Sequence, residues 1–290
     1  MSFDLVIGDR YPSSWSLRGW LLFEKFNIEH KLHHVSFIDD RLVEEQMPEF
    51  APAKTVPTVR TPEGVIVGDS LAIAEELASR YPDAGILPKD PAARAVARFL
   101  MSEMHSGFGD LRNDCPMNLR VAYSETSPSD EVKKDLARLE KIWAYARKTV
   151  GSEGPWLCGE YGAVDAFFAP VAARIAGYGL TVGPDAAAYV KAHLADPAFR
   201  RWRAMGMIKG AHLPWYERDY PQVNWPGPTP ILATNAEGPS ENTLCPYSRL
   251  PVTHFLSIDG CVFGFCNEFC RDKTRPDPAA WPAFMEIYQS

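Results

Sequence analysis

The chain has 290 residues, of which 46% are hydrophobic, and a formal net charge of −7. This length predicts two domains, or two domains with an additional small module. Lysine and arginine are scattered, and nucleic-acid binding needs a basic face, so we expect no nucleic-acid partner. No apolar run approaches the ~20 residues of a membrane-spanning helix. The N-terminus has no basic segment before an apolar core. We therefore expect neither membrane insertion nor secretion, and we expect a cytoplasmic protein.

The six cysteines are distributed unevenly. Cys115 and Cys158 stand alone, whereas the C-terminal region contains Cys245, Cys261, Cys266 and Cys270. In a reducing cytoplasm, cysteines are more often free thiols or metal ligands than disulfides. The C-terminal group is therefore a candidate metal site.

The N-terminal region alternates between apolar strands and helices. The expected elements, in chain order, are a strand at 5–8, a helix at 17–26, a strand at 30–35, a helix at 39–50, strands around Pro57 and at 65–67, and a helix from Leu71. The strand–helix–strand alternation predicts a parallel pair joined by a crossover. The complete order is the thioredoxin-like α/β arrangement, which we assign to residues 1–82.

A proline-containing strand and an Asp-Ser pair give the clearest local signal in this region. A proline has no N–H for a central ladder, so Pro57 in Thr55-Val56-Pro57-Thr58-Val59 belongs at a strand start or edge. A cis bond before Pro57 would turn the N–H and C=O of Val56 outward, free to pair with an extended peptide. Asp69 and Ser70 directly precede the helix from Leu71. Such residues are most often N-caps, but capping alone does not explain their pairing with the Val-Pro strand.

Long helices dominate the middle of the chain. Asp90-Pro91 is typical of an N-cap and a first helical position, and helically spaced apolar residues continue to about Met205. We assign residues 90–212 to an all-helical domain. Residues 213–243 contain six prolines and few periodic apolar positions, which indicates a connector that is either ordered or extended. Residues 244–290 form a separate cysteine-rich module.

The combination of Val56-Pro57 with Asp69-Ser70 resembles the glutathione transferase family, from residue 3 to about residue 205. In that family the cis-proline strand pairs with the cysteinyl backbone of glutathione, and the Asp-Ser pair holds its γ-glutamyl end. The resemblance implies that glutathione is bound by Lys54, Val56, Pro57, Asp69 and Ser70, with Lys54 reaching the glycyl carboxylate. It also implies a transferase-type helical domain that forms the pocket for a small electrophile, and a homodimer.

The start of the first helix resembles a more specific signature. Ser13-Ser14-Trp15-Ser16-Leu17-Arg18 is similar to the zeta-class and maleylacetoacetate isomerase sequence Ser-Ser-Cys-Ser-x-Arg, with Trp15 in place of the cysteine. In serine-type branches a hydroxyl here donates to the glutathione sulfur. A free thiol has a pKa near ~8.5, and a hydroxyl at a helix N-terminus stabilises the reactive thiolate. Ser13 is the first candidate for this donor and Ser14 the second; otherwise both only cap the helix. The indole of Trp15 makes isomerase activity the less favoured prediction.

Other polar residues give weaker signals. We expect His33 and His34 on a strand surface. His105, Arg112 and Asn113 fall near the expected electrophile pocket. A solvated His105 is a better prediction than a catalytic one.

The C-terminal module resembles the TRASH and YHS families of small metal-binding modules. The resemblance rests on Cys245-x20-Cys266-x3-Cys270 and on Asp259-Gly260, the strongest two-residue hairpin signal. In those modules a knuckle, a hairpin and a helix start direct their thiolates toward one metal. A structural zinc ion takes four Cys or His ligands in a tetrahedron, so a fourth ligand is needed.

The fourth ligand is chosen by position. Ser248 stands where a Cys-x-x-Cys knuckle would have a second thiol, and Cys261 lies roughly 16 Å along a strand from Cys266. His254 lies across the same hairpin, close to the level of Cys266. The predicted zinc ligands are Cys245, His254, Cys266 and Cys270. Three cysteines with a water, or reduced thiols without metal, are the alternatives.

Three functions are compatible with these residues. The favoured one is a glutathione transferase that activates the thiol for conjugation to a small electrophile or for addition–elimination, with glutathione as co-substrate and zinc in the module. The second is a metal-handling or metal-sensing protein that uses the transferase fold to bind glutathione. The third is a noncatalytic binding scaffold, because a fold does not fix a function.

Overall fold

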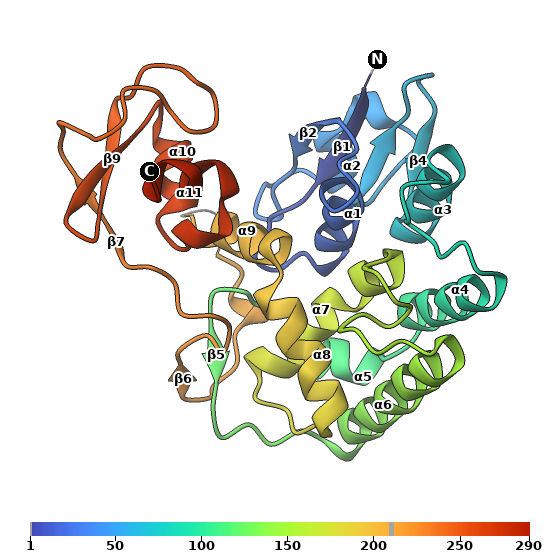
Figure 1. Ribbon diagram of the computed structural model, residues 1–290. Coiled ribbons are helices and arrows are strands. Elements are labelled where there is room, and N and C mark those ends of the chain that lie inside the picture. Colours follow the sequence, from blue (N-terminus) through green and yellow to red (C-terminus); the bar gives the residue numbers. More distant parts are fainter. Residues whose placement is uncertain (1, 209–211) are drawn as a thin grey trace. The chain divides into compact units, whose positions relative to one another are not determined.

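The computed structural model describes residues 2–208 and 212–290. The chain forms two compact units, which can be followed in Figure 1. The first contains Met1–Leu194 and Gly210–Pro226, and the second contains Ala195–Lys209 and Gly227–Ser290. This division differs from the four consecutive segments expected from the sequence, because a helix and a strand outside residues 244–290 pack with the cysteine-rich module.

The N-terminal part of the first unit is built on a four-stranded sheet. Its elements are β1 (Phe3–Ile7), α1 (Ser14–Glu24), β2 (His30–His34), α2 (Val43–Gln46), the 3-10 helix η1 (Pro48–Phe50), β3 (Thr58–Arg60), β4 (Ile66–Gly68) and α3 (Ser70–Arg80). The strand order is β2-β1-β3-β4, with β1 parallel to β2 and antiparallel to β3. The thioredoxin-like prediction is confirmed. The single helix expected at 39–50 is instead divided into α2 and η1, because Pro48 cannot continue the hydrogen bonding of α2.

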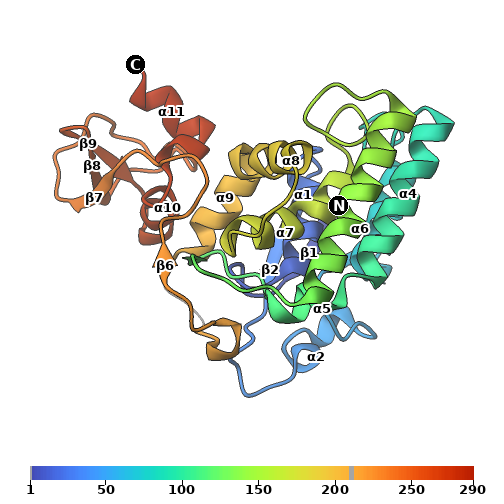
Figure 2. The same ribbon diagram turned by 90° about the horizontal axis from the view of Figure 1, so that it is seen from below.

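Helices form the rest of the first unit. They are α4 (Pro91–Ser106), α5 (Gly109–Asp114), α6 (Asp130–Val150), α7 (Ala163–Gly177) and α8 (Pro184–Ala195). Helix α7 is buried along nearly its whole length, and it packs against α4 and α1. Helices α4 and α6 lie side by side in both views (Figures 1 and 2). The contact between α7 and α1 brings the end of α7 close to the serines that begin α1.

The segment from residue 212 to 226 belongs to the first unit and is not a loose connector. It contains η2 (Pro214–Tyr216) and β6 (Gln222–Val223), and β6 pairs with β5 (Ala122–Tyr123). The N–H of Leu213 donates to the Tyr11 hydroxyl at 2.8 Å. The Arg218 guanidinium donates to the carbonyl of Asn113 at 2.8 Å and to that of Asp114 at 3.1 Å. These bonds fix the segment near the start of α1.

The second unit combines an antiparallel sheet with short helices. Its elements are α9 (Pro197–Gly206), β7 (Ala233–Ala236), β8 (His254–Ile258), β9 (Cys261–Phe265), α10 (Glu268–Thr274), η3 (Pro278–Ala280) and α11 (Pro282–Tyr288). The sheet order is β7-β8-β9. Asp259 and Gly260 both have positive φ in the β8–β9 turn, as an Asp-Gly hairpin requires. The predicted hairpin is confirmed, and β7 adds a third strand from the expected connector.

The second unit has an apolar core of its own. The core side chains are Ala204, Cys245, Leu256, Ile258, Phe263, Phe265, Cys270, Ala280, Trp281 and Phe284. Arg200 on α9 pairs with Asp277 through two hydrogen bonds of 2.8 and 2.6 Å. Helix α9 therefore contributes both apolar and ionic contacts to this unit. Among the described residues of the whole chain, no helix combines the length and the apolar character needed to cross a membrane.

Candidate functional site

The first candidate site is a cavity of about 480 Å³ in the first unit, at the start of α1. Its lining comes from the start of α1, the segment before β3, the α5 region, the end of α7 and the 212–226 segment: Pro12, Ser13, Ser14, Trp15, Phe37, Val43, Lys54, Thr55, Val56, Arg112, Asn113, Pro116, Arg174, Trp215, Tyr216 and Arg218. This volume falls within the range of small-ligand sites, roughly 300–1,000 Å³. Ser13, Ser14, Lys54 and Val56 were expected at a common site, and the structure brings them together.

The two serines at the start of α1 make different contacts. Ser13 is the N-cap: its Oγ accepts from the Ser16 N–H at 3.2 Å and donates to the Ser16 Oγ at 2.8 Å. Ser14 Oγ accepts a long hydrogen bond of 3.5 Å from Arg174 Nη2. Within the described residues, the Ser14 hydroxyl donates no hydrogen bond. The proton of Ser13 is therefore committed to capping, whereas the proton of Ser14 is available to a ligand.

The segment before β3 has the geometry expected of a peptide-binding edge. The Val56–Pro57 peptide bond is cis, as predicted. Strand β3 begins only at Thr58, and the backbone of Val56 makes no hydrogen bond within the described part of the chain. Lys54 is exposed at the cavity rim. The Val56 N–H and C=O are therefore free to pair with an extended ligand backbone.

Asp69 and Ser70 begin helix α3 and are not among the cavity-lining residues. Asp69 is the N-cap with a φ of 71°, and its carboxylate accepts from the Leu71 N–H at 2.7 Å. Ser70 is fully buried, yet its Oγ has no hydrogen-bond partner among the described residues. A buried hydroxyl without a partner is costly. The Ser70 hydroxyl is therefore the clearest sign in this region of a missing polar ligand.

His105 connects Asp69 to the cavity and was not expected to do so. Its Nε2 lies 3.3 Å from the Asp69 carboxylate, and its ring packs edge-on against Trp15 at 5.2 Å between centroids. Trp15 also has the guanidinium of Arg18 at 4.4 Å and that of Arg112 at 4.6 Å from its ring centroid. The indole that replaces the cysteine of the zeta-class signature is thus held between cations, each such contact contributing about 0.5–2 kcal/mol.

Arginines give the cavity region a positive charge, and no carboxylate among the described residues forms an ion pair with Arg112 or Arg174. Arg174 donates to the Cys115 and Pro170 carbonyls, and Arg112 donates to the His105 and Gly107 carbonyls. Burial is the main reason that the pKa of Arg174 falls to about 10, with the charge of Arg112 adding to it.

Arg18, which contacts the Trp15 ring, is a further buried arginine of this region. Two of its nitrogens have no partner among the described residues. The pKa of Arg18 lies well below its ordinary value because of burial, and the charges of Arg174 and Arg112 lower it further. The positive potential of these guanidiniums favours anions.

Several cavity residues escaped the sequence analysis. Arg174 lies on a helix about 160 residues after Ser14, and Trp215, Tyr216 and Arg218 lie in the stretch that was expected to be a connector. The sequence signal that could have identified the stretch is its aromatic content within a proline-rich segment, which is unusual for a solvated linker. No local pattern identifies Arg174.

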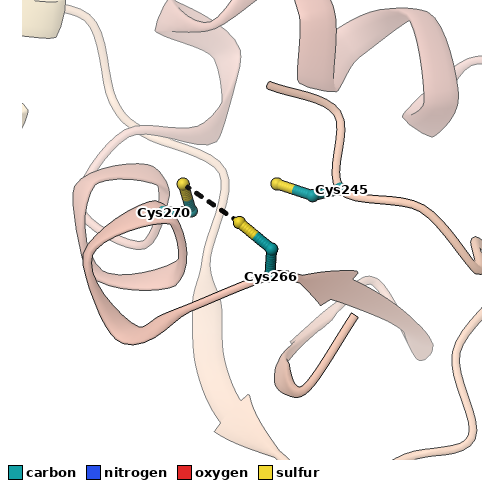
Figure 3. Close-up of side chains that lie close together, drawn as sticks. All are labelled: Cys245, Cys266 and Cys270. Atoms are coloured by element: carbon teal, nitrogen blue, oxygen red, sulfur yellow. Dashed lines mark hydrogen bonds between the residues drawn. The ribbon is translucent and has the colours of Figure 1, made fainter. Parts of the chain in front are cut away.

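A second candidate site is the cysteine cluster of the second unit (Figure 3). The sulfurs of Cys245, Cys266 and Cys270 all lie within 4.8 Å of one another, and those of Cys266 and Cys270 are 3.9 Å apart. Tetrahedral zinc with Zn–S bonds of about 2.3 Å requires sulfurs roughly 3.8 Å apart. The three thiols come from the segment before β8, the end of β9 and the first turn of α10, as the spacing predicts.

Hydrogen bonds favour the thiolate form of one cysteine in this cluster. Burial raises the pKa of Cys245, but hydrogen bonds from the N–H groups of Ser248, Cys266 and Tyr247 outweigh burial and lower it to about 7. Burial, together with the charge of Cys245, raises the pKa of Cys270 to about 12. Three thiolates at this spacing repel one another, so a cation is needed to ionise all of them.

His254 and Cys261 lie outside the cluster. His254 pairs with Phe265, as predicted, and its Nδ1 is 2.9 Å from the Thr253 hydroxyl. Paired residues project to the same face of a sheet and the next residue projects to the opposite face. The side chain of His254 therefore shares a face with Phe265 and not with Cys266. Cys261 pairs with Ile258 and is exposed, which agrees with the prediction that it is not a metal ligand.

Comparison with known proteins supports the N-terminal assignment. Residues 12–80 match the family described as glutathione S-transferase, N-terminal domain. The chain is 31% identical over 129 residues to maleylacetoacetate isomerase of Dictyostelium discoideum, covering 44% of this chain and 57% of that protein. It is 35% identical over 104 residues to probable maleylacetoacetate isomerase of Caenorhabditis elegans, covering 36% and 47%. The chain thus spans about half the length of the curated relatives it matches.

Solved structures show the same fold over a longer stretch. Glutathione transferase Omega 1C of Trametes versicolor aligns with a TM-score of 0.54 and 19% identity, covering 69% of this chain and 90% of that one. A glutathione transferase homologue from Burkholderia with bound glutathione aligns with a TM-score of 0.52 and 22% identity, covering 71% and 98%. The thioredoxin-like domain followed by helices is therefore the architecture of glutathione transferases.

Proposed function

We propose that the first unit is a glutathione transferase that binds glutathione along Val56 and activates its thiol beside Ser14. The observation that carries this proposal is the unsatisfied, fully buried hydroxyl of Ser70 at the start of α3. The γ-glutamyl group of glutathione would give that hydroxyl a partner. The free N–H and C=O of Val56 and the exposed Lys54 supply matching contacts for the cysteinyl backbone and the glycyl carboxylate.

Ser14 is the better thiol donor in this proposal, although Ser13 was the first choice from the sequence. The Ser13 hydroxyl donates to Ser16, whereas the Ser14 hydroxyl faces the cavity with its proton free. The N-terminus of α1 and the arginine charges favour the thiolate that results. Glutathione loses its thiol proton to solvent, and its sulfur attacks the electrophile.

The substrate class follows from the charge of the cavity. Arg112, Arg174 and Arg218 line it together with Lys54, and within the described residues the three guanidiniums donate hydrogen bonds only to neutral oxygens. We propose a small electrophile that carries a carboxylate. The relatives named as maleylacetoacetate isomerases support a reaction in which the glutathione sulfur adds to a carbon–carbon double bond and is then eliminated. Trp15, in place of the signature cysteine, supports simple conjugation instead.

We further propose that the second unit holds one zinc ion. The donor set fits: three sulfurs within 4.8 Å of one another, two of them 3.9 Å apart, suit zinc. The metal would be held by Cys245, Cys266 and Cys270. His254, which was predicted from the sequence as the fourth ligand, is not part of this proposal because its side chain lies on the other face of the sheet. A homodimer in the cytoplasm completes the proposal; a mass that stays monomeric at every concentration in sedimentation would count against the dimer.

Calorimetric titration with glutathione tests the proposal. Ser70→Ala should weaken binding more than tenfold, because a charge-assisted hydrogen bond contributes about 1.5–3 kcal/mol. Ser79→Ala is the matched control, since Ser79 lies on the same helix but is exposed and donates only to the Glu75 carbonyl. Equal affinity in the wild type and both variants would refute the glutathione site.

A further inference from the structure

The cysteine cluster has three protein ligands in the part of the chain that the structure describes. Among the described residues, the group of His, Cys, Asp and Glu atoms that could hold a metal here consists of three sulfurs. Two neutral side chains donate hydrogen bonds to one of these sulfurs: the Ser248 hydroxyl lies 3.1 Å from Cys266 Sγ, and the Asn267 amide nitrogen lies 3.3 Å from it. Neither is a ligand of the kind that zinc prefers in proteins.

One side of the cluster is accessible to solvent. Ser248 and Asn267 are exposed and Cys266 is half-buried, whereas Cys245 and Cys270 are buried. A small molecule can therefore approach the sulfur of Cys266 past two small polar side chains. A closed structural site would have a fourth protein ligand at this position.

The second unit also does not depend on a metal alone for its folding. Its core contains four buried aromatic side chains, Phe263, Phe265, Trp281 and Phe284, and helix α9 adds the Arg200–Asp277 ion pair. An isolated module of about forty residues would need a staple. The larger core seen here reduces that need, so loss of an ion from the cluster would not by itself unfold the unit.

We propose that the three-cysteine cluster is an open metal site, in which Cys245, Cys266 and Cys270 hold a thiophilic ion and an external thiol takes the fourth position. This inference rests on the metal site proposed above. An entering thiol loses its proton to solvent and displaces a water from the ion, so the three protein bonds persist. Thiolate ligands select ions such as Zn²⁺ and Cu⁺ over Mg²⁺ or Ca²⁺. The site thereby exchanges ions with small thiol complexes in solution.

Cobalt substitution tests the open position. The full-length protein, freed of metal, is titrated with Co²⁺ without oxygen, and its visible and charge-transfer absorption is recorded. We expect about one Co²⁺ per chain in a tetrahedral site with three thiolates. Addition of 2-mercaptoethanol should shift the visible bands and raise the charge-transfer intensity by roughly one third, as three thiolates become four.

Two variants separate the possible outcomes. Ser70→Ala, which disables the proposed glutathione site of the first unit, should show the same thiol-dependent shift. His254→Ala should leave the Co²⁺ spectrum unchanged. Uptake of Co²⁺ with a spectrum that ignores the added thiol, or a spectrum altered by His254→Ala, would show a closed site and overturn the inference. Absence of Co²⁺ uptake, with the thiols freely titratable, would overturn the metal site as well, and would leave the glutathione proposal untouched.

Discussion

The two candidate sites solve the same chemical problem, the stabilisation of thiolate sulfur, in opposite ways. The cavity of the first unit has no cysteine in its lining and offers a hydroxyl, a helix N-terminus and arginines to a thiol from outside. The cluster of the second unit supplies three thiols of its own, and the neutral side chains of Ser248 and Asn267 donate to one of them. The positive charge of the first site favours an anionic ligand, and the thiols of the second favour a cation.

This difference explains why the two regions call for different ligands. A preorganised positive site binds an anion without ionising any group of its own. A cluster of neutral thiols must lose protons as it binds, so its affinity for metal depends on pH. Charge within each site, more than its size, therefore indicates the ligand class.

Loss of one cluster cysteine should have the largest effect. Cys266→Ser should reduce bound zinc from about one ion per chain to nearly none, because only two of the four ligands of a tetrahedral zinc ion would then come from the protein. Elemental analysis of the purified protein measures this. Cys261→Ser is the matched control, since Cys261 is an exposed cysteine of the same hairpin, and it should retain the metal. Equal metal loss in both variants would mean that the cluster is not the site.

The serines of α1 should separate activity from stability. Ser14→Ala should lower kcat by about 10²-fold, the cost of removing a donor to a developing anion. Ser13→Ala should instead lower the free energy of unfolding by about 1 kcal/mol through loss of the N-cap, with kcat nearly unchanged. Steady-state kinetics and denaturant titration measure the two effects. A large loss of kcat in Ser13→Ala, with kcat nearly unchanged in Ser14→Ala, would identify Ser13 as the residue that donates to the glutathione sulfur.

Acid should destabilise the first unit through His193. This side chain is buried, and burial, with the charge of Lys25, lowers its pKa from 6.5 to about 3. The unfolded chain then binds a proton that the folded chain does not, so stability is intact above pH 6.5 and falls as the pH drops toward 3. At about pH 5 the expected loss is roughly 2 kcal/mol.

Denaturant titration at several pH values tests this effect. His193→Gln should remove most of the decrease in the free energy of unfolding between pH 6.5 and pH 3, although it will also change packing. His212→Gln, at an exposed histidine of the same unit, should leave this pH dependence unchanged. An unchanged slope in His193→Gln would assign the acid sensitivity to other groups.

The charge of the cavity should give the smallest and most selective effect. Arg112→Met should raise KM about tenfold for an electrophile that carries a carboxylate and leave KM for a neutral electrophile nearly unchanged. Arg112→Lys should restore part of the difference. If KM rises equally for both substrates, the role of Arg112 is to hold Trp15 and not to bind the anion.

Local patterns in the sequence predicted much of the first unit. The spacing of apolar residues and the positions of the prolines predicted the thioredoxin-like order of strands and helices. The cis bond before Pro57 agrees with the prediction that this proline lies at the edge or start of a strand. The arrangement of Arg174 and Arg218 around Ser14 was beyond reach, because it depends on how α7 and the 212–226 segment pack against α1. Such contacts between distant residues leave no periodic trace.

The second unit shows a different limit. The spacing of the cysteines predicted that Cys245, Cys266 and Cys270 meet, and the Asp-Gly turn fixed the register of the hairpin. The register itself excludes His254, because its partner Phe265 points to the other face from Cys266. The sequence pattern correctly predicted which residue pairs with His254, but not that the His254 side chain lies on the face of the sheet opposite to Cys266.

The most direct test of the proposed activity is the ionisation of bound glutathione. Ultraviolet absorbance of the thiolate, recorded against pH with the protein saturated, gives the pKa of the bound thiol. We predict a value below the ~8.5 of a free thiol, returning toward it in Ser14→Ala and remaining low in Ser13→Ala. A bound thiol with the pKa of free glutathione in the wild type would contradict thiol activation by this site.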